Sequence, residues 1–153
     1  MSLNMDNQMG PTLLRSYFSM VPLSNKAIVI CRSVAQATSL ATFFGDHDIL
    51  TERIWAGMKP ADMMRLVTGM ARGEAFVAFA GPAALKQALP TNLFDAALIL
   101  APTIELAVHQ SHYAFLRPGS LAIDFANNVP RHGIPEGYQG RIFAPVAIKQ
   151  KAA

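Results

Sequence analysis

Short apolar runs alternate along the chain with segments of helical periodicity. Residues 27–31 (Ala-Ile-Val-Ile-Cys) form an uninterrupted apolar run, which is typical of a strand buried on both faces of a sheet. Further runs recur at similar spacing, and most segments between them are long enough to carry a helix, as parallel strands require. The predicted strands are residues 27–31, 49–55, 75–80, 96–101, 121–125 and 142–148.

The segments between these strands carry the end signals of helices. Ser33 is a favoured N-cap residue, and Gly45 is a favoured residue at a helix end. The residues expected on the buried face of this helix are Val34, Ala37, Leu40, Ala41 and Phe44. Further helices are predicted from residue 60 to a stop at Gly73, over residues 82–89, and over residues 104–116 with Thr103 as the cap.

Strands joined by helical crossovers wind in the right-handed sense and place helices on both faces of one sheet. The pattern therefore predicts an α/β fold, a three-layer α/β/α Rossmann-like sandwich with a mostly parallel sheet of five strands plus a C-terminal edge strand. This last strand follows a loop at residues 127–140 without a predicted helix, which favours an antiparallel strand. We expect residues 26–153 to form a single Rossmann-like domain, and residues 1–25 an N-terminal arm that packs on it or on a partner subunit.

Composition narrows the class of protein. Hydrophobic residues make up 52% of the 153 residues and charged residues 15%, which excludes a disordered chain. The net charge of +3 arises from scattered cations without a basic stripe, so we expect no nucleic-acid partner. The single cysteine, Cys31, is either a reactive thiol or a small buried hydrophobe, and it allows no intramolecular disulfide. The apolar runs fall short of the ~20 residues of a membrane span. We expect a cytoplasmic protein without membrane contact.

Ligands of open parallel sheets bind beyond the carboxyl ends of the strands, where the strand order reverses. At the first helix, Arg32 and Ser33 offer a cation and a helix N-terminus to an anion, or else form a surface arginine beside an ordinary cap. Trp55 can stack on an adenine or anchor the edge of the sheet. The candidate cofactor-binding residues are Arg32, Ser33, Trp55, Gly81, Thr103, Asn127 and Asn128.

Three segments carry a resemblance to a known family. Residues 26–33 (KAIVICRS) resemble the first strand and turn of the cofactor domain of methylenetetrahydrofolate dehydrogenases. Residues 94–102 (FDAALILAP) are similar to a later strand of that family, and residues 116–125 (LRPGSLAIDF) to a late strand of that family and of shikimate-type dehydrogenases. The resemblance implies NAD(P) as the cofactor. Cys31 and Ala37 stand where the family has its fingerprint glycines, and the family's catalytic domain has no counterpart here.

Residues 94–125 also resemble class I methyltransferases, which place Phe-Asp before a fourth strand and Leu-Arg-Pro-Gly before a fifth. That resemblance implies S-adenosylmethionine as the ligand. The favoured interpretation is a Rossmann-like domain that binds a nucleotide, a dinucleotide or another anionic small molecule. The alternative is a structural protein that forms a homodimer or a larger homo-oligomer through its N-terminal arm and its apolar helix faces.

Catalytic chemistry is not specified by the spacing of residues, because the chain shows neither a nucleophile beside a base nor paired carboxylates. His109 and His112 lie near Glu105 at helical spacing, but a further metal ligand is not apparent, so no metal site is expected. His132 can act with Asp124 as an acid–base pair if the loop between them folds back. No catalytic residue is assigned.

Overall fold

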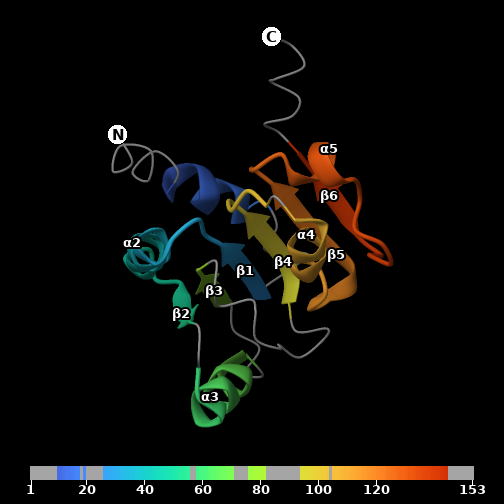
Figure 1. Ribbon diagram of the computed structural model, residues 1–153. Coiled ribbons are helices and arrows are strands. Elements are labelled where there is room, and N and C mark those ends of the chain that lie inside the picture. Colours follow the sequence, from blue (N-terminus) through green and yellow to red (C-terminus); the bar gives the residue numbers. More distant parts are fainter. Residues whose placement is uncertain are drawn as a thin grey trace.

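The computed structural model of the protein describes residues 10–17, 19, 26–55, 58–70, 76–81, 94–103 and 105–144 (Figure 1). Its elements are β1 (Lys26–Ile30), α2 (Val34–Gly45), β2 (Leu50–Ile54), α3 (Pro60–Met70), β3 (Phe76–Ala80), β4 (Phe94–Ile99), α4 (Leu106–Ser111), β5 (Leu116–Asp124), α5 (Asn128–His132) and β6 (Arg141–Phe143). Residues 10–17 form a further helix ahead of β1. The helix predicted at residues 82–89 lies outside the described residues.

The strands form one sheet in the order β2-β3-β1-β4-β5-β6, and every neighbouring pair is parallel. This confirms the predicted α/β, Rossmann-like fold. Ile30 of β1 is in register with Ala80 of β3 on one side and with Ile99 of β4 on the other. The dinucleotide-binding version of the fold has the order 3-2-1-4-5-6. Here β3 takes the place beside β1, so β2 is an edge strand.

The predicted antiparallel last strand is wrong. β6 pairs parallel with β5, with Ala122 opposite Ile142. The loop between these strands contains α5, which the sequence analysis missed. This helix and residues 133–140 return the chain to the amino edge of the sheet, so β6 enters in the same direction as β5. A parallel neighbour always needs such a return.

One face of the sheet is covered by α2 and by the N-terminal helix. Val29 and Phe79 of the central strands pack there with Phe44 of α2 and with Leu13 and Tyr17 of residues 10–17. The rings of Tyr17 and Phe44 meet edge to face, with centroids 6.0 Å apart. The described part of the N-terminal arm therefore packs on the body of the protein.

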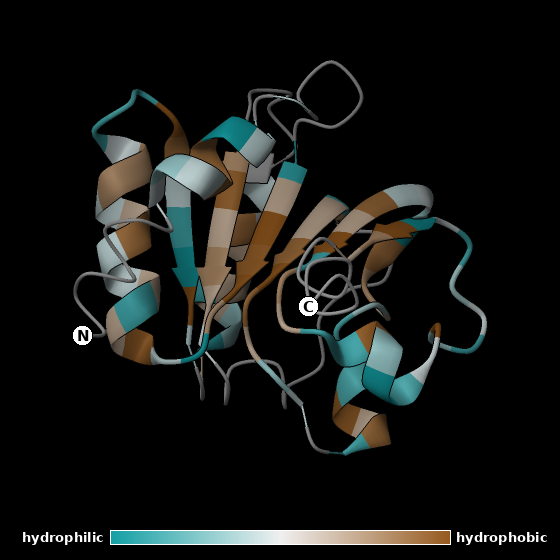
Figure 2. Ribbon diagram, turned by 90° about the horizontal axis from the view of Figure 1, so that it is seen from above, coloured by the Kyte–Doolittle hydropathy of each residue, from teal (hydrophilic) through white to brown (hydrophobic). Residues whose placement is uncertain are grey.

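The opposite face carries a second core. Successive residues of a strand point to opposite faces, so Ile28 and Ile30 join this core with Leu66 of α3 and with Phe94 and Phe115. The central strands are accordingly mostly brown in Figure 2, whereas the helices outside them carry teal, hydrophilic residues as well as brown ones. The prediction of three layers is confirmed by these two cores. None of the helices in the described ranges is long and apolar enough to cross a membrane.

α2 starts at the predicted cap. The Ser33 hydroxyl accepts the backbone N–H of Gln36 at 3.1 Å. Val34, which we expected on the buried face, is 66% exposed, because the first residue of the helix precedes the turn that meets the sheet. Gln36 is buried in its stead, and its Oε1 accepts the Arg32 N–H at 2.8 Å.

The segment predicted as one helix over residues 104–116 is divided. α4 ends at Ser111, and β5 begins at Leu116, opposite Phe94. Glu105 rather than Thr103 is the N-cap of α4. We predicted a turn at residues 117–119, before the strand. Instead, residues 117–120 belong to β5 as an irregular stretch, because the register between β4 and β5 shifts after Leu116.

Candidate functional site

The loops that follow β1, β3 and β4 leave the carboxyl edge of the sheet side by side. The Cys31 N–H donates to the Ala80 carbonyl at 2.8 Å, and the Leu100 N–H donates to the Ile30 carbonyl at 2.8 Å. From β1 the chain enters α2 on one face, whereas from β4 it leads through α4 to Tyr113 in the core of the other face. The direction of winding therefore reverses between β1 and β4, where open sheets form their ligand crevice.

The start of α2 presents N–H donors at this switch point. The N–H groups of Val34 and Ala35 have no acceptor within the helix, as holds for the first residues of any α-helix. Arg32 is exposed, and its side chain takes part in neither ion pair of the described residues. Arg32 and Ser33 thus lie at the positive end of α2, as predicted from their place in the sequence.

Gly81 follows β3 directly and is buried. A Cβ at this position would lie 3.3 Å from the Val34 side chain and 3.7 Å from the Val34 nitrogen. The missing side chain therefore allows the first turn of α2 to approach the end of β3. Gly81 therefore acts by close packing of β3 against α2.

Trp55 follows the edge strand β2 and is 42% exposed. β3 and β1 both lie between β2 and β4. At about 4.8 Å per strand, the ends of β2 and β4 are on the order of 14 Å apart. The structure thus brings Arg32, Ser33, Gly81 and the end of β4 to adjacent strands and leaves Trp55 at the margin.

Asn128 ties the loop after β5 to the loop after β4. Its Oδ1 accepts the Thr103 N–H at 2.9 Å, and its Nδ2 donates to the Ala101 carbonyl at 2.9 Å. The side chain is completely buried. Both of its polar atoms are in use, so Asn128 positions Thr103 rather than offering a free group to a ligand.

Thr103 lies at the centre of the polar groups of this edge. Its carbonyl accepts Nη1 of Arg131 at 2.9 Å and Nε2 of His132 at 2.8 Å. The residue is 4% exposed, yet its hydroxyl has no hydrogen-bond partner among the described residues. The same holds for the buried Oδ1 of Asn127, whose backbone is left-handed with φ at 61°. Thr103 and Asn127 therefore keep buried polar atoms without a partner among the described residues at the carboxyl edge of the sheet.

Two histidines that the sequence analysis did not connect lie behind Thr103. The rings of His109 and His132 stack with centroids 5.2 Å apart. Because a carbonyl can only accept, Nε2 of His109 is the donor to Gly133 at 2.9 Å, and Nε2 of His132 is the donor to Thr103. The sequence held no signal for this contact, because the fold of α5 brings His132 to His109.

The predicted pair of Asp124 and His132 does not form. The carboxylate of Asp124 accepts the N–H groups of Ala126 at 3.2 Å and Val129 at 2.7 Å. Asp124 is fully buried and holds the start of α5. Its role is therefore structural, at the point where the chain leaves β5.

His112 and Cys31 are also buried. Desolvation by burial, followed by the charge of His109, lowers the pKa of His112 to about 4, so this ring is neutral at physiological pH. Cys31 is fully buried in the core beside α2, which favours the hydrophobic interpretation over a reactive thiol. Within the described ranges, no three His, Cys, Asp or Glu residues are grouped so that they can hold a metal ion.

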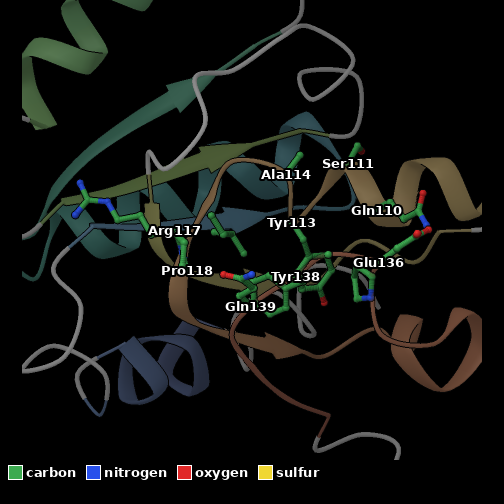
Figure 3. A pocket seen from close by; sticks show the side chains of 12 residues that line it. Gln110, Ser111, Tyr113, Ala114, Arg117, Pro118, Glu136, Tyr138 and Gln139 are labelled. Atoms are coloured by element: carbon green, nitrogen blue, oxygen red, sulfur yellow. The ribbon is translucent and has the colours of Figure 1, made fainter.

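A separate cavity of about 580 Å³ lies at the amino end of β5, between α4 and the loop before β6 (Figure 3). It was not predicted from the sequence, because its walls come from residues 110–118 and 135–139, two stretches that meet only in the folded chain. The lining residues that carry the argument below are Gln110, Tyr113, Pro118, Glu136, Tyr138 and Gln139.

The comparisons with known proteins give a structural similarity alone. No family model matches the chain, and no curated protein matches it. The solved structure of the Hef helicase domain from Pyrococcus furiosus is similar, with 13% sequence identity over 97% of this chain and a TM-score of 0.49. The chain spans 28% of that protein's chain. Any functional assignment therefore rests on the geometry of the site.

Proposed function

We propose that the protein is a Rossmann-like domain that binds a small anionic molecule, of the size of a nucleotide or smaller, in the crevice between β1 and β4. The observation that carries this proposal is the buried Thr103 hydroxyl, which has no partner in the described part of the chain. Leaving a buried hydroxyl unpaired costs about 1–3 kcal/mol. Such groups are few in native proteins and call for an explanation. A ligand oxygen in the crevice supplies the missing partner.

The charge of the ligand follows from the groups at the start of α2, beyond the carboxyl end of β1. Val34 and Ala35 are the first residues of a helix of twelve, and their N–H groups have no acceptor within that helix, so its positive pole lies at the carboxyl edge of the sheet. Arg32 adds a cation that no ion pair within the described residues neutralises. A phosphate or carboxylate matches this arrangement.

The size of the ligand follows from the strand order. In the dinucleotide-binding fold, an acidic residue about 20 residues beyond the glycine motif binds the ribose. Here β3 separates β2 from β1, and Trp55 follows β2 at the far edge. Cys31 and Ala37, at 0% and 4% exposure, fill the positions of the fingerprint glycines. These residues do not reproduce the way that fold holds NAD(P), so we propose a smaller anion.

The test is thermal unfolding of the full chain at low salt with inorganic phosphate, AMP, NAD, NADP and S-adenosylmethionine. A ligand at a hundred times its Kd adds about 2.7 kcal/mol to stability. For a chain of this size, that is a rise in Tm of roughly 5–10 °C. We expect a rise with phosphate or AMP. A rise confined to NAD(P) or S-adenosylmethionine would instead support the dehydrogenase or methyltransferase resemblance.

Two variants test the residues. Thr103→Val keeps the shape of the side chain and removes the hydroxyl, so we expect it to abolish the ligand-induced rise without lowering the Tm of the free protein. Arg32→Gln should weaken binding roughly two- to fivefold, the range for one exposed charge. Arg141→Gln, an exposed arginine at the start of β6, is the matched control. Unchanged ligand shifts in Thr103→Val, or no shift with any anion, contradict the proposal.

A second candidate is oligomerisation through the edge strand β2. Leu50 of β2 and Met64 of α3 are 47% and 67% exposed, and they line the same hollow of about 660 Å³. Unpaired strand edges favour association. Light scattering of the wild type and of Met64→Gln tests this: we expect a dimer that Met64→Gln weakens, and a monodisperse wild-type monomer excludes it.

A further inference from the structure

We infer that the cavity at the amino end of β5 is a second binding site, and that it takes a small organic cation with an apolar body, such as an aromatic amine. This site lies at the opposite edge of the sheet from the crevice between β1 and β4, and it is built from different residues. Its volume of about 580 Å³ is within the range of roughly 300–1,000 Å³ that is usual for small-molecule pockets.

Aromatic and proline side chains form the wall of the cavity. The rings of Tyr113 and Tyr138 meet edge to face with centroids 5.0 Å apart, and Pro118 and Pro135 flank them. Figure 3 shows both tyrosines together at the centre of the site. Burial raises the pKa of each, so both hydroxyls stay neutral. This wall therefore suits the apolar part of a ligand and carries no negative charge of its own.

The Tyr138 ring is held in place before any ligand binds. Its hydroxyl donates to the Ser120 carbonyl at 3.1 Å and accepts the Ser120 hydroxyl at 2.8 Å. A Cβ on Gly140 would collide with the Tyr138 hydroxyl and with the Ser120 carbonyl oxygen, so only glycine permits this arrangement. A pre-formed wall lowers the entropy that a ligand must lose on binding.

The charge of the lining favours a cation. Arg117 and Glu136 are its charged residues. Arg117 is ion-paired with Asp95 at 3.3 Å, and in Figure 3 its side chain extends away from the tyrosines. Glu136 is exposed on the other side of the site, near Gln110 in the same view, and it takes part in neither ion pair of the described residues. The Glu136 carboxylate thus gives the lining an unbalanced negative charge. The faces of the two tyrosine rings also attract cations.

The test is an NMR titration of the ¹⁵N-labelled full chain with tyramine and, separately, with 4-hydroxyphenylacetate. These probes share a phenol ring and differ in the sign of their charge. We expect tyramine at millimolar concentration to shift the amide resonances of Gly137, Tyr138 and Gln139, while the carboxylate leaves them in place. Glu136→Gln should weaken tyramine binding roughly two- to fivefold, the range for a single exposed ion pair.

Glu105→Gln is the matched control, because Glu105 is also exposed but lies outside the lining. It should bind tyramine as the wild type does. Equal shifts with the amine and the carboxylate would overturn the assignment of a cation. Unchanged binding in Glu136→Gln would overturn the role of the carboxylate, and no shifts at residues 137–139 up to about 10 mM tyramine would overturn the site itself.

Discussion

Replacement of Asn128 by alanine should destabilise the protein strongly. The side chain is completely buried and bonds with both of its polar atoms, to the Thr103 N–H and the Ala101 carbonyl. Asn128→Ala leaves that N–H and that carbonyl buried without partners, since Ala101 is 7% and Thr103 4% exposed. An unpaired buried group costs about 1–3 kcal/mol, so we expect a loss of about 3 kcal/mol.

Urea unfolding followed by circular dichroism measures this loss, and a thermal melt should show a fall in Tm of roughly 6–12 °C. Asn127→Gly is the control, because Asn127 has no partner for its Oδ1 within the described residues and glycine tolerates its φ of 61°. It should change stability by less than about 1 kcal/mol. Equal losses in the two variants would refute the assignment of Asn128 as the link between the loops.

Asn128→Asp refines the test. One carboxylate oxygen can still accept the Thr103 N–H, but the other faces the Ala101 carbonyl, which cannot donate. This repulsion and the burial favour the protonated acid, whose O–H can donate to that carbonyl. The variant should therefore recover stability relative to the wild type as the pH falls, and a pH-independent difference between the two would contradict the geometry.

Three further predictions concern other parts of the fold. The pKa of His112 is lowered to about 4 from 6.5, so between these pH values the unfolded chain binds a proton that the folded chain does not. The free energy of unfolding should therefore have its full value above pH 6.5 and fall by up to about 3 kcal/mol toward pH 4. His112→Leu should reduce this pH dependence in urea titrations. Ser33→Ala should cost about 1 kcal/mol through loss of the cap of α2, whereas Ser33→Asp, which restores an acceptor, should recover most of it in the same melts. Gly140→Ala should displace Tyr138 from Ser120 and lower the Tm by several degrees, and an unchanged near-ultraviolet tyrosine spectrum would argue against that displacement.

The sequence was sufficient where burial was complete. β1, β3 and β4 have continuous apolar stretches because both of their faces are covered, and their predicted ranges lie within two residues of those observed. Ser33 marked the start of α2 correctly, since capping depends on local geometry alone. The direction of β6 was mispredicted because α5, a helix of five residues, is too short to show a periodic pattern.

The candidate site was predictable in position but not in chemistry. Because ligands of open parallel sheets bind beyond the carboxyl ends of the strands, Thr103 and Asn128 were correctly assigned to one edge of the sheet. Only the fold shows that they form a hydrogen bond with each other. The stack of His109 and His132 depends on the path of residues 124–133, which no local preference specifies. The cavity around Tyr138 was not predicted, because its lining combines residues 110–118 with residues 135–139, which meet only through the path of the chain after β5.

The position of β3 between β1 and β2 also governs the order in which the protein can fold. A nascent chain that has emerged only as far as α3 contains β1 and β2, but these strands are not neighbours in the sheet and share no hydrogen bonds. The first native strand pair becomes possible only when Phe76–Ala80 arrives and binds both of them at once. Synthesis therefore has to reach Ala80 before the sheet can nucleate, and closure of these long loops should make refolding slower than that of helical proteins of equal size.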